Sequence, residues 1–424
     1  MSKSPWAWVP SLYFAQGIPY VVVMTLSVIL YKNLGFSNTD IALYTSWLYL
    51  PWVIKPLWSP LVELFGRKRQ WVVLLQFVLG AALASVALTL PGPQAFKMSL
   101  AVFWLMAFAS ASHDIAADGF YLLALPQKTQ AAFVGVRSTA YRLANIGGQG
   151  GLVWLAGHLA ERTGSIVTAW SWVFGVLGGG FALLALWHLW ALPRPLADAP
   201  GPGRHGAGSL VQDFVGVFAR FFAKPRIAVI LGFLLLYRFP EAQLLKLATP
   251  FLLDPPSEGG LGLTTQQVGI AYGTVGLTAL TLGGLLGGWV ISRVGLKRAL
   301  WPLVAAMHVP NVVFLVLALV HPPGLVVVSS LLALEQFGYG LGFTAYLMAM
   351  ILFAEGQDKT AHYAICTGFM ALGMMLPGMW SGALQDAIGY VPFFAWVLLA
   401  TIPSLAMTAL LRIPEGFGRE DAAS

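Results

Sequence analysis

Long runs of apolar residues, separated by short polar turns, dominate the pattern along this chain. Twelve runs reach the length of about 20 residues that a helix needs to cross a bilayer. They cover residues 6–31, 40–64, 70–91, 97–125, 131–160, 167–192, 226–252, 265–292, 297–320, 324–353, 360–386 and 390–412. Gly and Pro interrupt several runs, which bilayer helices tolerate. The pattern predicts an all-α polytopic membrane protein with 12 transmembrane helices, the first run being a span and not a removed signal.

The composition strengthens this prediction. Of the 424 residues, 58% are hydrophobic and only 10% are charged, whereas soluble domains carry about 25% charged residues. The single cysteine, Cys366, lies inside an apolar run, so an intrachain disulfide is excluded. The sequence also suggests no metal site and no cofactor.

Basic residues concentrate in one of the two alternating sets of loops and ends. That set holds 16 of the 24 Lys and Arg residues, namely Lys3, Arg67, Lys68, Arg69, Lys128, Arg194, Arg204, Arg220, Lys224, Arg226, Arg293, Lys297, Arg298, Lys359, Arg412 and Arg419. The other set holds 3, namely Lys32, Lys97 and Arg162. Because cytoplasmic loops are enriched in Lys and Arg, we expect both termini in the cytoplasm. The net charge of +7 then points to anionic lipid and not to nucleic acid.

One long connection divides the runs into six plus six. It begins with the Pro/Gly-rich PRPLADAPGPGRHGAG and ends with SLVQDFVGVFARFF, whose apolar residues have the spacing of a helix lying on the inner membrane surface. We predict an N-terminal six-helix bundle (1–192), a cytoplasmic linker with an amphipathic helix (193–225), a C-terminal six-helix bundle (226–412) and a cytoplasmic tail (413–424).

The two halves resemble each other. Gly66 and Gly295 align at an offset of 295 − 66 = 229, and each is followed two residues later by a basic residue, Lys68 or Lys297. Such a duplication is typical of two bundles that rock about a midplane site. We expect spans 3, 6, 9 and 12 to lie outside the cavity between the bundles.

The stretch Ser112–Gly119, S-H-D-I-A-A-D-G, places two carboxylates inside the fourth run. Asp114 and Asp118 are four residues apart and share a helix face. One interpretation is a proton relay or substrate contact, because adjacent desolvated acids raise each other's proton affinity. The other is a static salt bridge to a basic residue of a neighbouring span, for which the candidates are Lys55, Arg137 and Arg142. His113 titrates in the right range for coupling, or it faces a neighbouring helix.

Other ionisable residues also fall inside the apolar runs. Arg238 and Glu241 are three residues apart in run 7 and can pair locally, or Arg238 can hold an anionic group of the cargo. Glu335 in run 10 has no partner nearby in sequence and is a proton-site candidate. Lys55 either faces the interior or extends toward the cytoplasm. Aromatic residues such as Trp47 can stack on sugar rings or simply pack.

The loops between spans 2 and 3 and between spans 8 and 9 resemble the signature G-x-x-x-(D/E)-R-x-G-R-(R/K) of the major facilitator superfamily. The first copy retains Glu63, Gly66, Arg67 and Lys68, and the second retains Arg293 and Gly295. Finer matches resemble the AmpG-type muropeptide permeases, and they cover nearly the whole chain. They are Gly17-Ile18-Pro19, Lys55 with Leu57-Trp58-Ser59-Pro60, the D-I-x-x-D of span 4, Tyr141-Arg142-Leu143 with the following Gly cluster, Tyr237-Arg238 with Glu241, Glu335, and Pro377-Gly378.

This resemblance implies a major facilitator fold and proton-driven import of anhydro-muropeptides, the sugar–peptide fragments of cell-wall turnover, across a bacterial inner membrane. The same broader group resembles siderophore importers and acetyl-coenzyme A transporters. A siderophore and acetyl-coenzyme A are therefore alternative cargos. His113 and Pro240 depart from the family pattern and leave the cargo open. We expect a monomer in lipid whose partners are protons and a small substrate, with Lys55, Arg142, Arg238, Glu241, Tyr13, Trp47 and Tyr141 as substrate contacts.

Two other classes of function fit the sequence less well. A Mg²⁺-dependent membrane transferase could use D-x-x-x-D to hold the metal, but such an enzyme needs a second acidic cluster, and Glu241 and Glu335 stand alone. A sensor that binds the same ligand without moving it is the third possibility, although 424 residues leave no output domain. The sequence therefore favours a secondary transporter over an enzyme.

Overall fold

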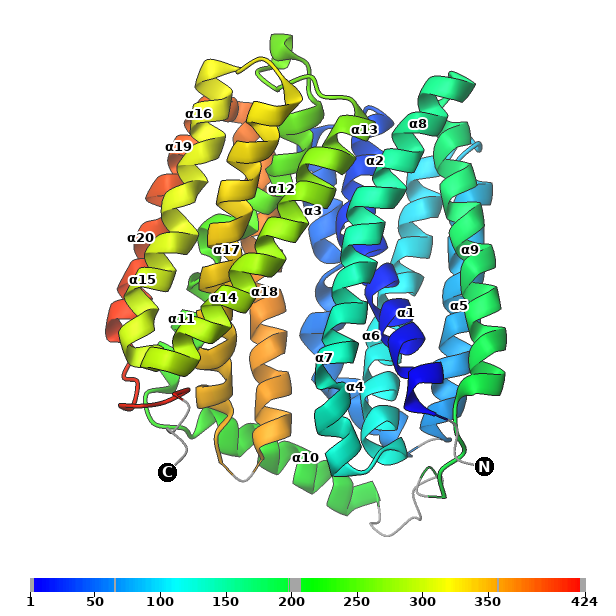
Figure 1. The fold of residues 1–424 in the computed structure, drawn as a ribbon, viewed down its shortest axis with the longest axis vertical. Helices are drawn as coiled ribbons and strands as arrows, with labels where there is room; N and C mark the ends of the chain where they lie inside the picture. The colour runs from blue at the N-terminus through cyan, green and yellow to red at the C-terminus, as the bar shows by residue number, and fades with distance from the viewer. Residues whose placement is uncertain (1–3, 65, 197, 199–206, 357, 420–424) are drawn as a thin grey trace. The chain divides into compact units, whose positions relative to one another are not determined.

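The computed structural model describes residues 4–64, 66–196, 198, 207–356 and 358–419. Each predicted run coincides with helical structure (Figure 1). In the first half the helices are α1 (Val9–Val21), α2 (Ser27–Asn33), α3 (Asn38–Trp47), α4 (Leu50–Leu64), α5 (Lys68–Thr89), α6 (Ala95–Ala124), α7 (Gln127–Ile146), α8 (Val153–Thr163) and α9 (Ile166–Ala191).

The second half follows the same plan after the amphipathic helix α10 (Ala207–Phe222), which the sequence predicted. Its helices are α11 (Ile227–Leu236), α12 (Phe239–Leu253), α13 (Thr265–Val268), α14 (Leu277–Val294), α15 (Leu296–His308), α16 (Val312–Val320), α17 (Leu325–Ala354), α18 (Lys359–Ile388), α19 (Tyr390–Leu399) and α20 (Thr401–Leu410). Short π-helical segments at Val22–Leu26, Gly147–Leu152 and Gly269–Gly276 continue spans 1, 5 and 8.

Within the described residues, 10 helices are long and apolar enough to cross a membrane. The remaining two predicted spans correspond to α3 with α4 and to α7 with α8. Polar residues occupy much of α7, so this part of span 5 is less apolar than the ten helices. The all-α polytopic prediction is confirmed, and the count of twelve crossings stays a prediction.

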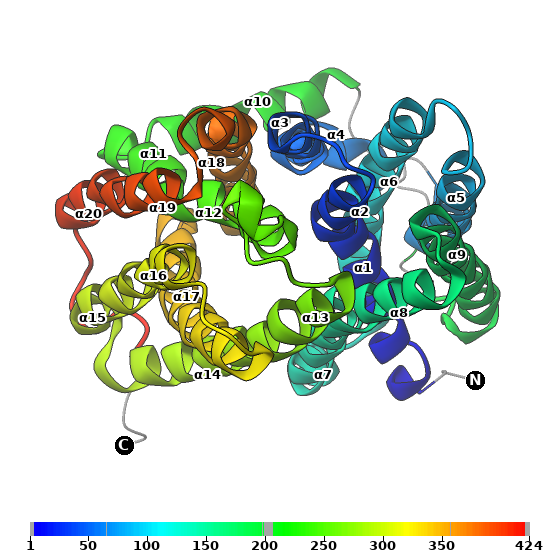
Figure 2. The same cartoon turned by 90° about the horizontal axis from the view of Figure 1, so that it is seen from above.

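The chain divides into two compact units. Unit 1 comprises residues 1–36 and 54–204, and unit 2 comprises residues 37–53 and 205–424. In unit 1, α5 packs against α6 and α9, and α1 packs against α6 and α7. In unit 2, α17 packs against α14 and α15, α12 packs against α18, and α3 packs along α18 (Figure 2).

Glycines determine two kinds of local geometry. Gly80 on α5 and Gly178 on α9 allow close helix packing, since a Cβ on Gly178 would lie 2.9 Å from the Gly80 carbonyl oxygen. Gly66 and Gly295 have φ of +75° and +79°, which residues with a Cβ rarely adopt. These two turns begin α5 and α15, so the aligned loop glycines have the same backbone role in both halves.

Two further contacts hold connecting segments in place. Asp198 accepts hydrogen bonds from the backbone nitrogens of Lys68 (2.7 Å) and Arg69 (3.1 Å). This carboxylate therefore caps amide groups at the start of α5 that have no partner within the helix. In unit 2, Arg220 of α10 pairs with Asp358, which precedes α18, at 2.5 Å. Phe221 of α10 is fully buried in the unit 2 core.

Candidate functional site

The two carboxylates of α6 each meet a cation from another helix of unit 1. Lys55 Nζ on α4 lies 3.5 Å from Asp114 Oδ2. Arg137 Nη2 on α7 lies 3.0 Å from Asp118 Oδ1. The Tyr13 hydroxyl on α1 donates a hydrogen bond of 2.9 Å to the same Asp118 oxygen. The stretch S-H-D-I-A-A-D-G thus gathers residues from α1, α4 and α7.

Aromatic rings hold the Arg137 guanidinium beside Asp118. Its central carbon lies 4.4 Å from the centroid of the Tyr13 ring and 5.1 Å from that of the Tyr121 ring, which are cation–π distances. The Asp118 and Arg137 side chains are 43% and 32% exposed, and Asp114 is less exposed at 17%. Asp118 is therefore the more accessible of the two carboxylates.

His113 contacts a different helix from the one that Asp114 contacts. Its Nε2 lies 3.1 Å from Gln76 Nε2 on α5, and Gln76 Oε1 lies 2.8 Å from His188 Nδ1 on α9. His188 Nε2 lies 2.9 Å from Ser11 Oγ on α1. Ser11 Oγ also lies 3.2 Å from the Trp8 carbonyl oxygen, so its single hydrogen is donated either to Trp8 or to His188. Sequence reasoning missed Gln76 and His188, although both are polar residues in apolar runs.

Span 7 is interrupted between α11 and α12, at Tyr237 and Arg238. Pro240 at the start of α12 lacks a backbone N–H, which explains the break. Arg238 donates a hydrogen bond to the Tyr339 hydroxyl, and its guanidinium carbon lies 4.8 Å from the Phe343 ring centroid. Arg238 is therefore a buried cation held by aromatic residues of α17.

Glu241 contacts residues that the sequence did not connect with it. Its Oε1 lies 2.7 Å from His308 Nδ1 and accepts a hydrogen bond of 3.2 Å from Asn311. His308 Nε2 lies 2.8 Å from Ser404 Oγ, and Ser404 donates to the Tyr237 carbonyl. Since the Ser404 hydrogen is used, His308 Nε2 must donate to Ser404. Glu241 and His308 therefore form a buried pair that joins α12 to α15.

Glu335 on α17 is 1% exposed. Its Oε2 accepts a hydrogen bond of 2.8 Å from the Gln336 side chain, which also donates to the Tyr272 hydroxyl at 3.3 Å. No Lys or Arg in the described part of the chain forms an ion pair with it. Glu335 is therefore a shielded carboxyl group whose hydrogen-bond partner is the Gln336 amide.

The remaining cargo candidates lie on α7 and α3. Tyr141 and Arg142 follow Arg137 by about one turn on α7. Trp47, at the end of α3 in unit 2, is 39% exposed. These positions leave the aromatic rings of Tyr141 and Trp47 in separate units.

The loop-motif residues have unequal roles. Lys68 is buried, and its alkyl chain contacts Gly119 of α6. Arg67 is exposed, whereas the Arg293 guanidinium carbon lies 5.8 Å from the Trp289 ring centroid. The Glu63 side chain lies outside the described residues. Gly66 and Gly295 serve as the turns described above.

Spans 3, 6, 9 and 12 supply Gln76, His188, His308 and Ser404 to these buried networks, although their sequences are mostly apolar. Sequence reasoning also gave no role to Lys246 or to the cluster in which Tyr390 and Asn38 donate to Asp254 at 2.5 and 3.3 Å. A single polar residue inside an apolar run was the available signal for each. Their partners could not be read from the sequence, because they lie on distant segments.

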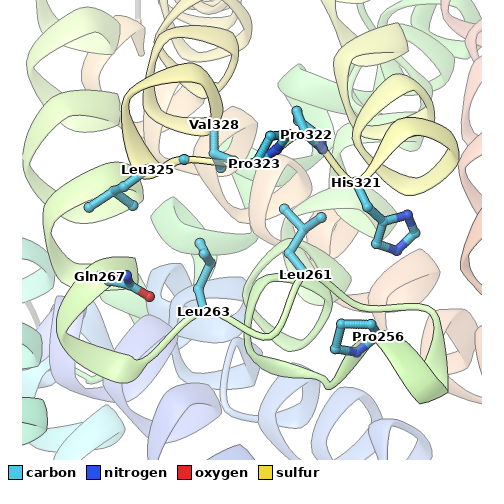
Figure 3. Close-up of a pocket in the computed structure, with 10 residues that line it drawn as sticks. Pro256, Leu261, Leu263, Gln267, His321, Pro322, Pro323, Leu325 and Val328 are labelled. Carbon is cyan, nitrogen blue, oxygen red and sulfur yellow. The ribbon is translucent and has the colours of Figure 1, made fainter.

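A separate hollow of about 370 Å³ opens in unit 2 between the α12–α13 and α16–α17 connections (Figure 3). Gln267 and His321 supply polar side chains, and the rest of the lining is mainly proline and aliphatic, including Pro256, Leu261 and Val328. None of the sequence-predicted site residues lines it.

A polytopic helical fold with ionisable side chains inside its spans is typical of membrane transporters. The family model of the Major Facilitator Superfamily matches residues 11–376, and the chain belongs to this superfamily. Family and fold indicate a transporter of small molecules and not an enzyme.

Among curated relatives, the chain is similar to the anhydromuropeptide permease of Escherichia coli (strain K12). The two are 26% identical over 413 residues, which is 95% of this chain and 78% of that protein. A putative transporter AmpG 4 of Rickettsia conorii is 25% identical, with 93% of each chain covered. The crystal structure of a mutant of the nucleoside transporter NupG matches with a TM-score of 0.68, 16% identity, and coverage of 95% of this chain and 97% of that one. That structural likeness shows the fold.

Proposed function

We propose that this chain is a proton-coupled secondary transporter that imports an anhydromuropeptide, or a similar sugar–peptide, by alternating access. The observation that carries the proposal is the similarity to the anhydromuropeptide permease along 95% of this chain. Acids that are paired or buried inside the spans support it, since ionisable groups within a bilayer commonly mark substrate and proton pathways.

We assign proton coupling to Asp118 together with Asp114, with Glu335 and His113 as further candidates. Protonation of Asp118 removes the charge that holds Arg137 at 3.0 Å, which weakens the link between α6 and α7. A carboxylate that must be neutral or paired in each conformation links proton binding to movement.

The cargo contacts in this proposal divide by chemistry. Lys55, Arg142 and Arg238 are assigned to anionic groups of the peptide, and Glu241 to a polar or cationic group. Tyr13, Trp47 and Tyr141 are assigned to the faces of the sugar rings.

The moving parts are the bundles 1–192 and 226–412, joined by the linker 193–225 and followed by the tail 413–424. We assign the control of their movement to the two loop motifs, which contain Glu63, Gly66, Arg67, Lys68, Arg293 and Gly295.

The test is uptake of a labelled anhydromuropeptide into proteoliposomes with and without an imposed pH gradient. We expect accumulation only when the interior is the more alkaline side. A siderophore and acetyl-coenzyme A, run in parallel, serve as alternative cargos. Uptake of either of these, with none of the anhydromuropeptide, contradicts the proposed cargo. Equal accumulation without a pH gradient contradicts proton coupling.

We place the protein in a bacterial inner membrane as a monomer, with both termini in the cytoplasm. The matched probes are Lys359→Cys on the predicted cytoplasmic side and Gln94→Cys on the other, both exposed, in a Cys366→Ser background. An impermeant thiol reagent should label Gln94→Cys in intact cells and Lys359→Cys only after lysis. The reverse pattern contradicts this orientation.

A further inference from the structure

Lys246 is a cation inside span 7 to which no role has been assigned. It lies on α12 and is 5% exposed. Its Nζ donates a hydrogen bond of 2.9 Å to Thr45 Oγ1 on α3 and lies 5.3 Å from the Tyr49 ring centroid. Within the described ranges no carboxylate forms an ion pair with it. A buried ammonium group without a counter-charge is costly, so a structural role alone accounts for it poorly.

A hydroxyl group without a hydrogen-bond partner in the described part of the chain lies near Lys246. Ser46 on α3 is fully buried, and its Oγ has no hydrogen-bond partner among the described residues. Gly378 on α18 packs closely against both side chains, which brings Ser46 and Lys246 to one place. A Cβ at this position would lie 2.7 Å from Ser46 Oγ and 3.3 and 3.5 Å from Lys246 Cγ and Cε.

The hydrogen-bonding capacity around Gly378 is that of an anion site. An ammonium group has three N–H donors, and Thr45 takes one of those of Lys246. The Ser46 hydroxyl adds a donor. Lys55 and Arg137 differ in this respect, since each has an aspartate within ion-pair distance.

We propose that Lys246 and Ser46 form a subsite for a carboxylate of the transported molecule, with Thr45, which donates to the Ile41 carbonyl, positioning Lys246. This inference rests on the proposed function, because the peptide part of an anhydromuropeptide supplies the carboxylate. An ammonium–carboxylate contact gives charge-assisted hydrogen bonds, which are stronger than neutral ones. The α3 helix forms one wall of the subsite, so the ligand enters when α3 moves away from α12.

The test compares an anhydromuropeptide with the same molecule whose peptide carboxylates are converted to carboxamides. In the unaltered protein the acid should compete for uptake at least about tenfold better than the amide. Lys246→Met should reduce this preference because the acid weakens, while competition by the amide is unchanged; the part that remains belongs to Lys55, Arg142 and Arg238. Lys246→Arg, which retains the charge, should keep more of the preference. Lys224→Met is the matched control, because Lys224 donates to the Glu355 carbonyl outside the spans.

A second variant tests the subsite independently. Gly378→Ala places a methyl group against Ser46 Oγ and Lys246 and should also weaken the acid selectively. If either variant fails to transport, binding of the acid and of the carboxamide to the purified protein in detergent gives the same acid-to-amide comparison. An acid-to-amide ratio in Lys246→Met equal to that of the unaltered protein overturns the subsite and leaves the proposed function intact. Failure of the unaltered protein to take up or bind the anhydromuropeptide overturns both, which distinguishes the two failures.

Discussion

The acids inside the spans are held in different ways in the two units. In unit 1, Asp114 and Asp118 are partly exposed and pair with the fixed cations Lys55 and Arg137. In unit 2, Glu241 and Glu335 are each 1% exposed and contact His308 and Gln336. A proton bound to Asp114 or Asp118 would release Lys55 or Arg137, whereas a proton bound to Glu335 in unit 2 would release no lysine or arginine of the described residues. Protonation can therefore change helix contacts in unit 1 and chiefly changes net charge in unit 2.

The largest expected effect comes from neutralising Asp118. One pH unit supports up to about tenfold accumulation if one proton moves with each cargo molecule and no membrane potential is imposed. Asp118→Asn should abolish this accumulation, because it mimics the protonated acid, and should retain exchange of cargo across the membrane. Proteoliposome uptake and counterflow of the labelled anhydromuropeptide measure the two properties separately.

The double variant Asp118→Asn/Arg137→Gln is the control for a purely structural pair. If both accumulation and exchange fall in the single variant and return in the double variant, the pair only joins α6 to α7. If Asp118→Asn accumulates cargo as well as the unaltered protein does, the coupling acid lies elsewhere, and Glu335→Gln becomes the decisive variant.

An intermediate effect should appear in the stability of unit 2. His308→Phe leaves the Glu241 carboxylate buried without its main partner, which should cost about 3–5 kcal/mol of folding free energy. Glu241→Gln should cost only about 1 kcal/mol, since its amide can donate to neutral His308. Thermal unfolding in detergent should therefore rank His308→Phe well below Glu241→Gln.

The matched comparison in unit 1 is Lys55→Met. The Lys55 and Asp114 side chains are 27% and 17% exposed, so water can replace part of the lost contact. Its cost should be smaller than that of His308→Phe. An equal or greater loss in Lys55→Met would show that burial does not separate the two kinds of acid.

How much of this could be predicted from the sequence differs between the fold and the sites. The spans were predictable because an apolar run of about 20 residues has few alternatives in a bilayer. The cations beside Asp114 and Asp118 were among three candidates, and the choice depends on helix rotations that a sequence does not specify. The contact between Glu241 and His308 joins residues 67 positions apart, and local spacing suggested Arg238 as the partner.

The smallest effect is expected for the ion pair between Arg220 and Asp358, which lies outside the spans. It serves as a comparison for ion pairs inside the spans. A hydrogen bond from Arg220 holds the pKa of Asp358 below its ordinary value. Because the folded pKa is the lower one, the pair contributes stability above the unfolded pKa of about 3.9 and loses it as the pH falls through the folded value. Hydrogen exchange of residues 207–222 should thus be flat between pH 5 and pH 8 after correction for the intrinsic rate. Asp358→Asn should speed this exchange less than about fivefold and only above the folded pKa. A larger change, or one that grows toward acid, would mean that α10 is held by this pair and not mainly by burial of residues such as Phe221.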